Sequence, residues 1–147
     1  ENDLKIESVS VGDLVKDEAE LINVMIEDKP IELKLNLDTE LLVYANEKVL
    51  SGLIGNLLRN AATYTDQGHI SIKTLKDRIE VADTGIGMTQ DEIKQIFEAH
   101  FRGNHQKRAG YGIGMTIVKK FVDRFDWNIE VESSPGIGTQ VSVIFHE

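Results

Sequence analysis

Residues 31–37 alternate strictly between apolar and polar side chains, which is the pattern of a β-strand with one buried and one solvated face. A sheet built from such strands has one apolar face, and other elements must cover that face. Most of the further strand-like runs come in pairs that a short turn can join, which favours a mixed, mostly antiparallel sheet. These further runs are residues 5–11, 41–44, 69–75, 78–82, 128–132 and 139–145.

Helical periodicity occupies the segments between the strands. A polar, aperiodic stretch at 104–110 predicts a loop before the last helix. We therefore expect residues 1–147 to form a single domain, a two-layer α/β sandwich with the helices on one face of the sheet. The predicted helices are residues 13–28, a segment that Asn46 caps and that ends at Tyr64, 90–100 and 113–125.

Composition excludes several classes of function. The chain has 147 residues, a formal net charge of −9 and no cysteine. The charge argues against general nucleic-acid binding, and the lack of cysteine excludes disulfides and thiolate metal sites. No apolar run approaches the ~18 residues of a membrane span, and no signal peptide is visible. Because the chain begins at Glu1 without an initiator Met, we expect it to be a fragment of a longer protein.

Two asparagines, Asn56 and Asn60, interrupt an apolar helical run at 49–64. Their four-residue spacing puts both side chains on one face of the helix, and Thr63 and Tyr64 continue the same edge. Asparagine is a poor interior helix residue and a buried amide needs partners, so this edge predicts the wall of a site. The alternative is a solvated face that carries two surface amides.

The segment Asp83-Thr84-Gly85-Ile86-Gly87-Met88 follows a predicted strand directly. The strand end fixes Asp83, and the glycines let the backbone approach a ligand closely. A carboxylate only accepts hydrogen bonds, so Asp83 would select the amino group of adenine over the carbonyl group of guanine. The alternative is a strand-ending turn that the Asp side chain closes.

A second glycine-rich segment, residues 110–114, leads into the last predicted helix. The N-terminus of a helix has exposed N–H groups and can hold a phosphate, with glycines allowing close approach. The chain contains neither a P-loop nor a Rossmann fingerprint. The alternative is a flexible hinge before a packed helix.

The residues between the two glycine-rich segments add apolar anchors and positive charge. Phe97 and Phe101 share a helical face and are expected to anchor the loop that follows. Arg102 suits a bidentate phosphate contact, whereas Lys107 and Arg108 by themselves fit a solvated loop.

Asn60 and Tyr64 have a possible role in binding a nucleotide. Mg²⁺ keeps most of its waters and takes one or two protein oxygens beside the phosphates of its substrate, so the amide oxygen of Asn60 would suffice. Tyr64, one turn further along the helix, could stack on an adenine.

Taken in order, these motifs resemble the asparagine, first glycine, phenylalanine and second glycine boxes of the catalytic and ATP-binding domain of two-component sensor histidine kinases. Residues 136–139 look like the third glycine box of that domain. The resemblance covers essentially the whole chain. It implies the Bergerat-type α/β sandwich, which the Hsp90 and gyrase B ATPases share.

The resemblance also implies site residues. Asn56, Asn60 and Arg102 would be catalytic, with Asn60 as the Mg²⁺ ligand and Arg102 at the terminal phosphate, and residues 89–112 would form an ATP lid. ATP contacts are implied for Asn56, Asn60, Tyr64, Asp83, Gly85, Gly87, Met88, Arg102, Lys107, Gly110, Tyr111, Gly112, Ile113, Gly114, Met115 and Thr139.

Asn56 bears on the reaction. The ATP-hydrolysing relatives carry a water-activating glutamate at this position, and an amide cannot act as that base. The resemblance therefore implies slow hydrolysis and transfer of the γ-phosphoryl group to a histidine on a separate helical dimerisation domain, followed by relay to a response-regulator aspartate. We expect that dimerisation domain and any sensor domain to lie outside this chain. The chain's own histidines are expected to be structural or surface residues: His69, His100, His105 and His146.

The resemblance further implies where the parent protein works. It would be a membrane-anchored homodimer of the inner membrane with this domain in the cytoplasm, and the isolated domain would be a monomer. No nucleic acid is expected among its partners.

Two departures from the family pattern stand out. Thr63 occupies a position where the family usually has Lys or Arg, and Arg59 or Lys107 could substitute for that cation. The loss leaves open a nucleotide-binding regulatory module, such as an anti-sigma factor or a degenerate kinase; a hydrolysing ATPase is disfavoured by Asn56. The sequence Phe125-Asp126-Trp127 replaces the usual His-Gly pair, and Trp127 is expected to be a packing residue.

Overall fold

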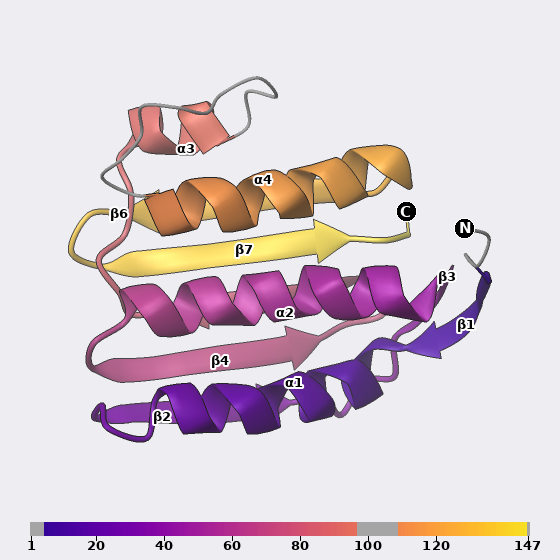
Figure 1. Ribbon diagram of the computed structural model, residues 1–147, viewed down its shortest axis with the longest axis horizontal. Helices are drawn as coiled ribbons and strands as arrows, with labels where there is room; N and C mark the ends of the chain where they lie inside the picture. Colours follow the sequence, from indigo (N-terminus) through magenta and orange to yellow (C-terminus); the bar gives the residue numbers. More distant parts are fainter. Residues whose placement is uncertain (1–4, 97–108, 147) are drawn as a thin grey trace.

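The computed structural model describes residues 5–96 and 109–146, and of residues 109–114 it describes the backbone alone. Five strands form the main sheet in the spatial order β2-β4-β5-β7-β6, of which Figure 1 labels β2, β4, β7 and β6. β2 runs parallel to β4, and all other neighbouring strands are antiparallel, which confirms the mixed, mostly antiparallel sheet. The strands are β2 Ile31–Asn36, β4 Gly68–Thr74, β5 Arg78–Asp83, β6 Asn128–Ser134 and β7 Gly138–Ile144.

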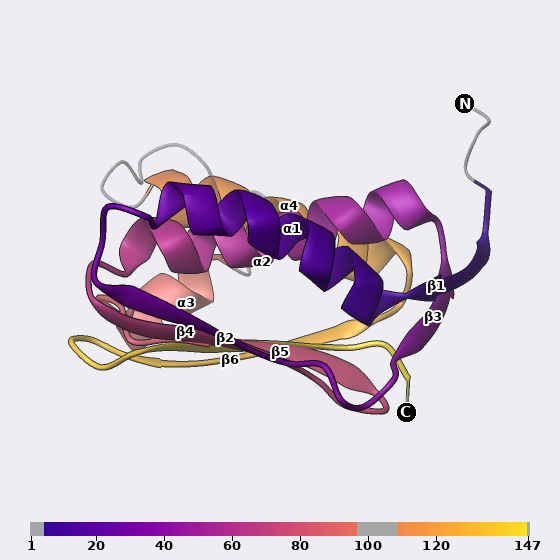
Figure 2. The ribbon, with the colours of Figure 1, turned by 90° about the horizontal axis from the view of Figure 1, so that it is seen from below.

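Three helices form a layer over one face of the sheet, with α2 between α1 and α4 (Figures 1 and 2). On that face the paired residues Ile72, Val81 and Val141 are buried. One residue further along, Lys73 pairs with Glu80, and both point to the open face. This alternation confirms the two-layer sandwich. The helices are α1 Val11–Met25, α2 Glu47–Tyr64 and α4 Ala109–Arg124.

α2 is the helix that carries the two asparagines. Its first turn is capped as the sequence predicts, because the side chain of Asn46 accepts a hydrogen bond from the Val49 amide at 3.1 Å. Its last turn contains no basic residue. The helix buries one side against the sheet through Leu50, Leu53, Ile54, Leu57, Leu58 and Ala61.

Lys29, in the loop between α1 and β2, supplies the cation that the end of α2 lacks. Its Nζ donates to the carbonyls of Ala62 and Thr65, both at 3.0 Å, and lies 3.8 Å from an Asp66 carboxylate oxygen. A cation at the C-terminal end of a helix satisfies free carbonyls and opposes the negative end of the helix dipole. The loop thereby fixes the end of α2 nearest the site.

A two-stranded antiparallel ribbon of β1 (Glu7–Ser10) and β3 (Leu42–Ala45) lies at the other end of the molecule (Figure 1). The predicted strand at 5–11 is shorter than expected, since α1 begins at Val11. The reason is Ser10, whose hydroxyl accepts from the Asp13 amide at 3.3 Å and so caps the helix.

The short helix α3 (Gln90–Ile96) begins with a capping box. The Thr89 amide donates to Glu92 at 2.9 Å, and the Glu92 amide donates to the Thr89 hydroxyl at 3.1 Å. The predicted helix extends to residue 100, and its last residues lie outside the described part of the chain.

The start of α4 corrects a prediction. The sequence predicts a loop through residue 110 and a helix from 113, but α4 begins at Ala109. Gly110 and Gly112 therefore have helical backbone, at a cost of about 1 kcal/mol each relative to alanine. Glycine permits both loop and helix, so its presence alone does not decide where a helix starts.

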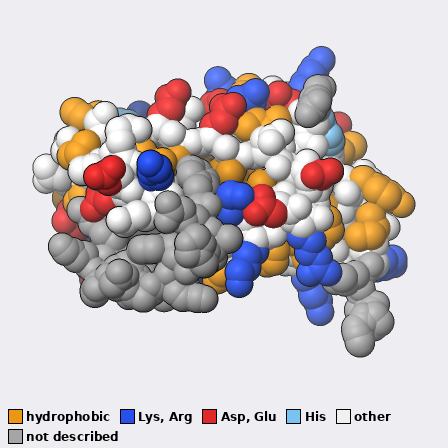
Figure 3. All heavy atoms as spheres, turned by 90° about the horizontal axis from the view of Figure 1, so that it is seen from above, with side chains coloured by type: hydrophobic (Ala, Val, Ile, Leu, Met, Phe, Trp, Pro, Cys, Tyr) orange, Lys and Arg blue, Asp and Glu red, His pale blue; other side chains and the backbone are white. Residues whose placement is uncertain are grey.

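β6 forms one edge of the sheet, and Figure 3 looks onto the side of α4 and β6. Acidic and basic side chains are spread among the apolar ones on this side. Along β6, Asn128, Glu130 and Glu132 are exposed and alternate with half-buried residues. Charged side chains on an edge strand disfavour pairing with another sheet.

Candidate functional site

Three polar side chains lie in a row where the inner face of the sheet ends. Asp83 on β5 pairs with Thr139 on β7, which pairs with Ser133 on β6. Two residues away along the strands, the equivalent row is apolar and includes Val81 and Val141. Because side chains two apart on a strand share a face, the polar row lies on the side that the helices cover. Polar groups at such a place are candidates for ligand binding.

Asp83 is held at one of its two carboxylate oxygens. Its Oδ1 accepts from the Gly85 amide at 2.8 Å and from the Thr139 amide at 3.3 Å. Burial raises the pKa of Asp83, and the two backbone hydrogen bonds oppose that rise. Among the described residues no hydrogen bond is made by Oδ2, so this oxygen is placed to accept one from a ligand.

The turn after Asp83 is packed against two other segments. A Cβ on Gly85 would overlap the Tyr64 carbonyl oxygen, and one on Gly87, whose φ is +73°, would overlap the Ser134 carbonyl oxygen. The Ile86 amide donates to that Tyr64 carbonyl at 3.1 Å. Close approach of the backbone is thus required by the protein's own packing, in addition to the ligand approach that the sequence suggests.

Ser133 also lies in this candidate site, although no sequence motif points to it. Its Oγ accepts from the Met88 amide at 2.8 Å, donates to the Gly138 carbonyl at 3.0 Å and lies 2.7 Å from the Thr139 hydroxyl. The signal that could have found it is strand register, since a hairpin that pairs residue 139 with 133 puts both side chains on one face.

Asn56 and Asn60 differ in their hydrogen bonds. The Asn56 Nδ2 donates to the Gly52 carbonyl of its own helix at 2.8 Å. Asn60 is 9% exposed, and its buried Nδ2 has no partner among the described residues. Asn56 lies on the side of α2 toward α4, because it follows Gly52 by four residues and a Cβ on Gly52 would be 3.5 Å from the Phe121 ring of that helix.

The amide of Asn60 fits a Mg²⁺–phosphate group. The buried Nδ2 is a hydrogen-bond donor that has lost water without compensation, and a phosphate oxygen would supply the missing acceptor. Among the described residues no cluster of three His, Asp or Glu could hold a metal by itself. A metal bound here would therefore use water and ligand oxygens beside the amide oxygen of Asn60.

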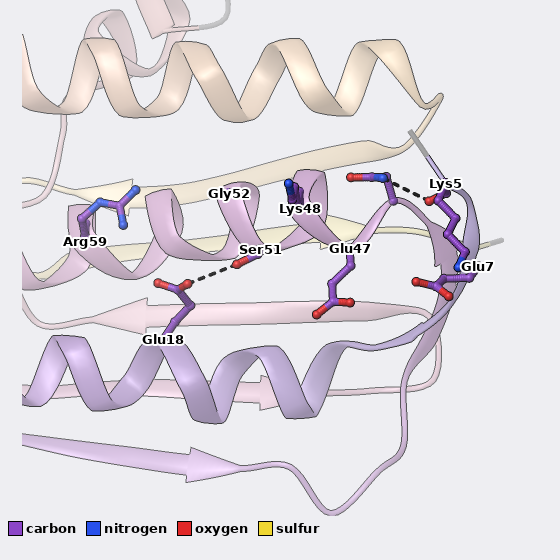
Figure 4. A pocket seen from close by; sticks show the side chains of 9 residues that line it. Lys5, Glu7, Glu18, Glu47, Lys48, Ser51, Gly52 and Arg59 are labelled. Atoms are coloured by element: carbon purple, nitrogen blue, oxygen red, sulfur yellow. Dashed lines mark hydrogen bonds between the residues drawn. The ribbon is translucent and has the colours of Figure 1, made fainter. Parts of the chain in front are cut away.

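Arg59 is not on the side of the asparagines, which corrects one of the suggested substitutes for the missing cation. Its guanidinium lies over Gly55, near the carboxylate of Glu18 on α1. Figure 4 shows Arg59 at a cavity of about 630 Å³ beside α2 that contains neither Asn56 nor Asn60. This cavity is lined by Lys5, Glu7, Glu18, Asn46, Glu47, Lys48, Ser51, Gly52 and Arg59.

The other predicted site residues lie at the end of α2, in the core, in the backbone of α4 or outside the described part of the chain. Tyr64 is half-buried and Thr63 exposed at the end of α2, and Met88 and Met115 are each 1% exposed in the core. Arg102 and Lys107 lie outside the described residues, as do His100 and His105. For five residues of the second glycine-rich segment only the helical backbone is described: Gly110, Tyr111, Gly112, Ile113 and Gly114.

Trp127 packs as the sequence predicts. Its ring stacks on Phe125 at 5.0 Å and meets Phe145 edge-on at 4.8 Å. His69 and His146 are exposed, and the His146 Nε2 lies 3.0 Å from the Leu42 carbonyl oxygen.

No helix in the described residues is both long enough and apolar enough to cross a bilayer.

Curated relatives of the chain are sensor kinases. The sensor histidine kinase YxdK of Bacillus subtilis (strain 168) is 29% identical over 99% of this chain and 47% of its own length. The adaptive-response sensory kinase SasA of Crocosphaera subtropica is 33% identical over 86% of this chain and 35% of its own length. The chain thus spans about half the length of the first relative and about a third of the second.

Solved structures have the same fold. The crystal structure of full-length ShkA in complex with AMPPNP superposes with a TM-score of 0.81 and 26% identity, covering 97% of this chain and 31% of ShkA. The mycobacterial sensor histidine kinase MprB superposes with a TM-score of 0.78 and 22% identity, covering 96% of this chain and 97% of that one. These matches confirm the predicted sandwich.

The sequence model described as "Histidine kinase-, DNA gyrase B-, and HSP90-like ATPase" matches residues 45–147, well over half of the chain. The matched part contains α2 with both asparagines, the turn after Asp83 and the row that Thr139 and Ser133 complete. The chain therefore belongs to the family of histidine kinase-, DNA gyrase B- and HSP90-like ATPases.

Proposed function

We propose that this chain binds Mg-ATP and transfers the γ-phosphoryl group to a histidine on a separate helical dimerisation domain. The observation that carries the proposal is Asn56, which lies one turn before Asn60 and is hydrogen-bonded to the carbonyl of Gly52. An amide held in this way cannot take a proton from an attacking water. The site therefore favours an acceptor that needs no base.

The base of the nucleotide would bind at the polar row. The free Oδ2 of Asp83 would accept from the amino group of adenine, while Oδ1 stays bonded to the backbone. Guanine has a carbonyl oxygen at the matching position, and two acceptors repel each other. ATP is therefore expected to bind much better than GTP. The expected Kd for ATP is in the micromolar range or weaker, which corresponds to a binding free energy of about −8 kcal/mol or one that is less favourable.

The phosphates would bind between α2 and the start of α4. Asn60 would offer its amide oxygen to Mg²⁺, which when bound neutralises phosphate charge. Its Nδ2, which has no partner among the described residues, would donate to a phosphate oxygen. Arg102 and the glycine-rich segment 110–114 are proposed for the terminal phosphate, within a lid at about 89–112. In this arrangement the chain's own residues position the nucleotide and exclude a base-catalysed attack by water.

The acceptor would be a neutral imidazole. One ring nitrogen already carries a lone pair, so a bond to the γ-phosphorus can form as the bond to the bridging oxygen breaks and ADP leaves. The phosphoryl group would then pass to an aspartate of a response regulator. The parent protein is proposed to be a homodimeric, membrane-anchored sensor kinase with this domain in the cytoplasm. The isolated domain is proposed to be a monomer, and a light-scattering mass of twice the monomer's would contradict this.

The test is transfer of label from γ-labelled ATP. The chain is mixed with the helical dimerisation domain of its parent protein, and acid-labile, alkali-stable label on that domain is the expected result. The same mixture with the acceptor histidine changed to glutamine is the control and should stay unlabelled.

One rival function has an observation in its favour. Thr63 is exposed and uncharged where the family usually has a phosphate-binding cation, which suits a regulatory module that binds nucleotide and transfers nothing. Tight ATP binding without any label on the partner domain would establish that rival. Fast release of labelled phosphate by the chain alone would instead support a hydrolysing ATPase.

A further inference from the structure

Ser133 makes three polar contacts through a single hydroxyl group, which has one proton and two lone pairs. The Met88 amide, at 2.8 Å, uses one lone pair. The Gly138 carbonyl, at 3.0 Å, is an acceptor only and needs the proton of Ser133. The remaining contact is with the Thr139 hydroxyl at 2.7 Å, where either oxygen could donate.

Only one assignment turns all three contacts into hydrogen bonds. If Ser133 donates to Gly138, then Thr139 must donate to the second lone pair of Ser133. If Ser133 donated to Thr139 instead, its oxygen would lie 3.0 Å from the Gly138 carbonyl oxygen with no proton between them. Half-satisfied networks of this kind are costly in a buried place, and Thr139 is 5% exposed. The proton of Thr139 is therefore directed at Ser133.

This assignment determines what Thr139 offers to a ligand. With its proton engaged, the Thr139 oxygen can only accept. Thr139 lies directly opposite Asp83, and its amide donates to the Asp83 carboxylate, so the two side chains are neighbours on the same sheet face. The end of the sheet therefore presents two adjacent acceptors, the Asp83 Oδ2 and the Thr139 Oγ1.

We propose that Ser133 is a positioning residue for base specificity, which holds Thr139 as an acceptor beside Asp83 so that the pair selects the amino group of adenine. The inference rests on the proposed binding of ATP and adds a residue to it. Adenine has two N–H bonds on its amino group, whereas guanine has a carbonyl oxygen at that place. Without Ser133, the Thr139 hydroxyl could turn and donate to that oxygen.

The test compares ATP and GTP affinity by calorimetry in wild type and Ser133→Ala. The alanine variant should bind ATP about tenfold more weakly, because the Thr139 hydroxyl is no longer held as an acceptor for the adenine amino group. GTP affinity should fall less or rise, so that the ratio of the two dissociation constants moves toward one. A purely structural role of Ser133 would weaken both nucleotides alike and leave the ratio unchanged.

Matched variants separate the hydroxyl from the strand. Ser134→Ala removes the neighbouring hydroxyl, which is exposed and alternates to the other face, and should leave both affinities unchanged. Ser133→Thr keeps a hydroxyl and should restore the preference for ATP. Ser133→Cys, a weak donor and acceptor of similar size, should lose most of that preference and replaces the alanine variant if alanine prevents folding.

The outcomes also distinguish this inference from the proposed function. An unchanged ratio in Ser133→Ala, or the same change in Ser134→Ala, overturns the role of Ser133 while ATP binding by the wild type stands. A folded wild type that binds neither nucleotide overturns both. A shifted ratio that Ser133→Thr restores supports both.

Discussion

The base side and the phosphate side of the proposed site are built differently. On the base side, Asp83, Thr139 and Ser133 lie on three paired strands and are held by hydrogen bonds among themselves and to the backbone, which leave the Asp83 Oδ2 free among the described residues. On the phosphate side, Asn60 is buried on α2 with an amide nitrogen that has no partner among the described residues. Strand register fixes the positions of the three residues on the base side. On the phosphate side, the Asn60 Nδ2 gains a hydrogen-bond partner only when a ligand binds.

This difference separates selection from chemistry. Groups held by sheet register are preorganised, so they can discriminate between bases at little cost when a ligand binds. An amide nitrogen buried without a partner costs stability in the free protein, and a phosphate oxygen that accepts from it recovers this cost. The base side should therefore control which nucleotide binds, and the phosphate side whether it reacts.

The largest effect is expected for Asn60→Ala. Loss of the proposed metal ligand should reduce label transfer roughly a hundredfold or more, by analogy with lost metal contacts elsewhere. Without nucleotide the variant should be at least as stable as wild type, because it removes a buried Nδ2 that has no partner among the described residues. Exposed Asn23→Ala on α1 is the control. Unimpaired transfer by Asn60→Ala would remove Asn60 from the mechanism.

Asp83→Asn should act on the base side alone. The amide can keep an oxygen toward the Gly85 and Thr139 amides, but it turns the free acceptor into an N–H donor. ATP affinity should fall about tenfold or more while GTP loses less, since a donor suits a guanine carbonyl. Calorimetry with both nucleotides measures this, and an equal loss for the two would place the base elsewhere.

The same variant tests the electrostatics of the base side. Burial raises the pKa of Asp83 above its ordinary value of 3.8, so the folded state keeps a proton that the unfolded state has lost. Stability from this group is then present below the unfolded pKa and is lost as pH rises through the folded pKa. Asp83→Asn does not titrate. As the pH rises from the unfolded pKa through the folded pKa of Asp83, the variant should therefore gain stability relative to wild type. Urea unfolding at a series of pH values checks this, and parallel curves contradict it.

Lys29→Met should show that the two sides share a support. The Lys29 ammonium holds the end of α2, and the Tyr64 carbonyl there accepts from the turn that follows Asp83. Losing the two carbonyl contacts should cost about 1 kcal/mol of unfolding free energy. Asp66→Asn removes only an exposed ion-pair partner and should cost less than about 0.5 kcal/mol. Equal losses in the two variants would assign the effect to the ion pair.

The fold could be predicted because alternation and helical periodicity are local signals. The alternation of residues 31–37 predicts a half-exposed strand, and Asn46 predicts a helix start, without any tertiary contact. The boundaries failed where a local signal has two meanings. Ser10 ends a strand and caps a helix, and glycines 110 and 112 suit a loop as well as the helix that they occupy.

The site was only partly predictable for a related reason. Asp83 and Asn60 stand out because a polar residue there breaks an apolar pattern. Ser133 becomes visible only through the register that pairs it with Thr139, and Lys29 only through contacts with carbonyls 33 and 36 residues away. Arg59 was a reasonable substitute cation by sequence distance, but its place on the helix points it toward Glu18. Contacts between residues that are distant in the chain are therefore the part of the site that local sequence patterns do not predict.

The smallest effect is expected for Thr63→Lys, which restores the family's usual cation on the phosphate side. Thr63 is exposed and lies three residues after Asn60 on α2, so an ammonium there can reach a phosphate bound near Asn60. Because the group is solvated, the gain in ATP affinity should be only about three- to fivefold at low salt and should shrink as ionic strength rises. Thr63→Met, of similar length but uncharged, should show no salt-dependent gain. If both variants bind ATP equally well, the phosphate side does not lack a cation. The basic residues within 97–108 would then be the candidates for the cation that binds the phosphate.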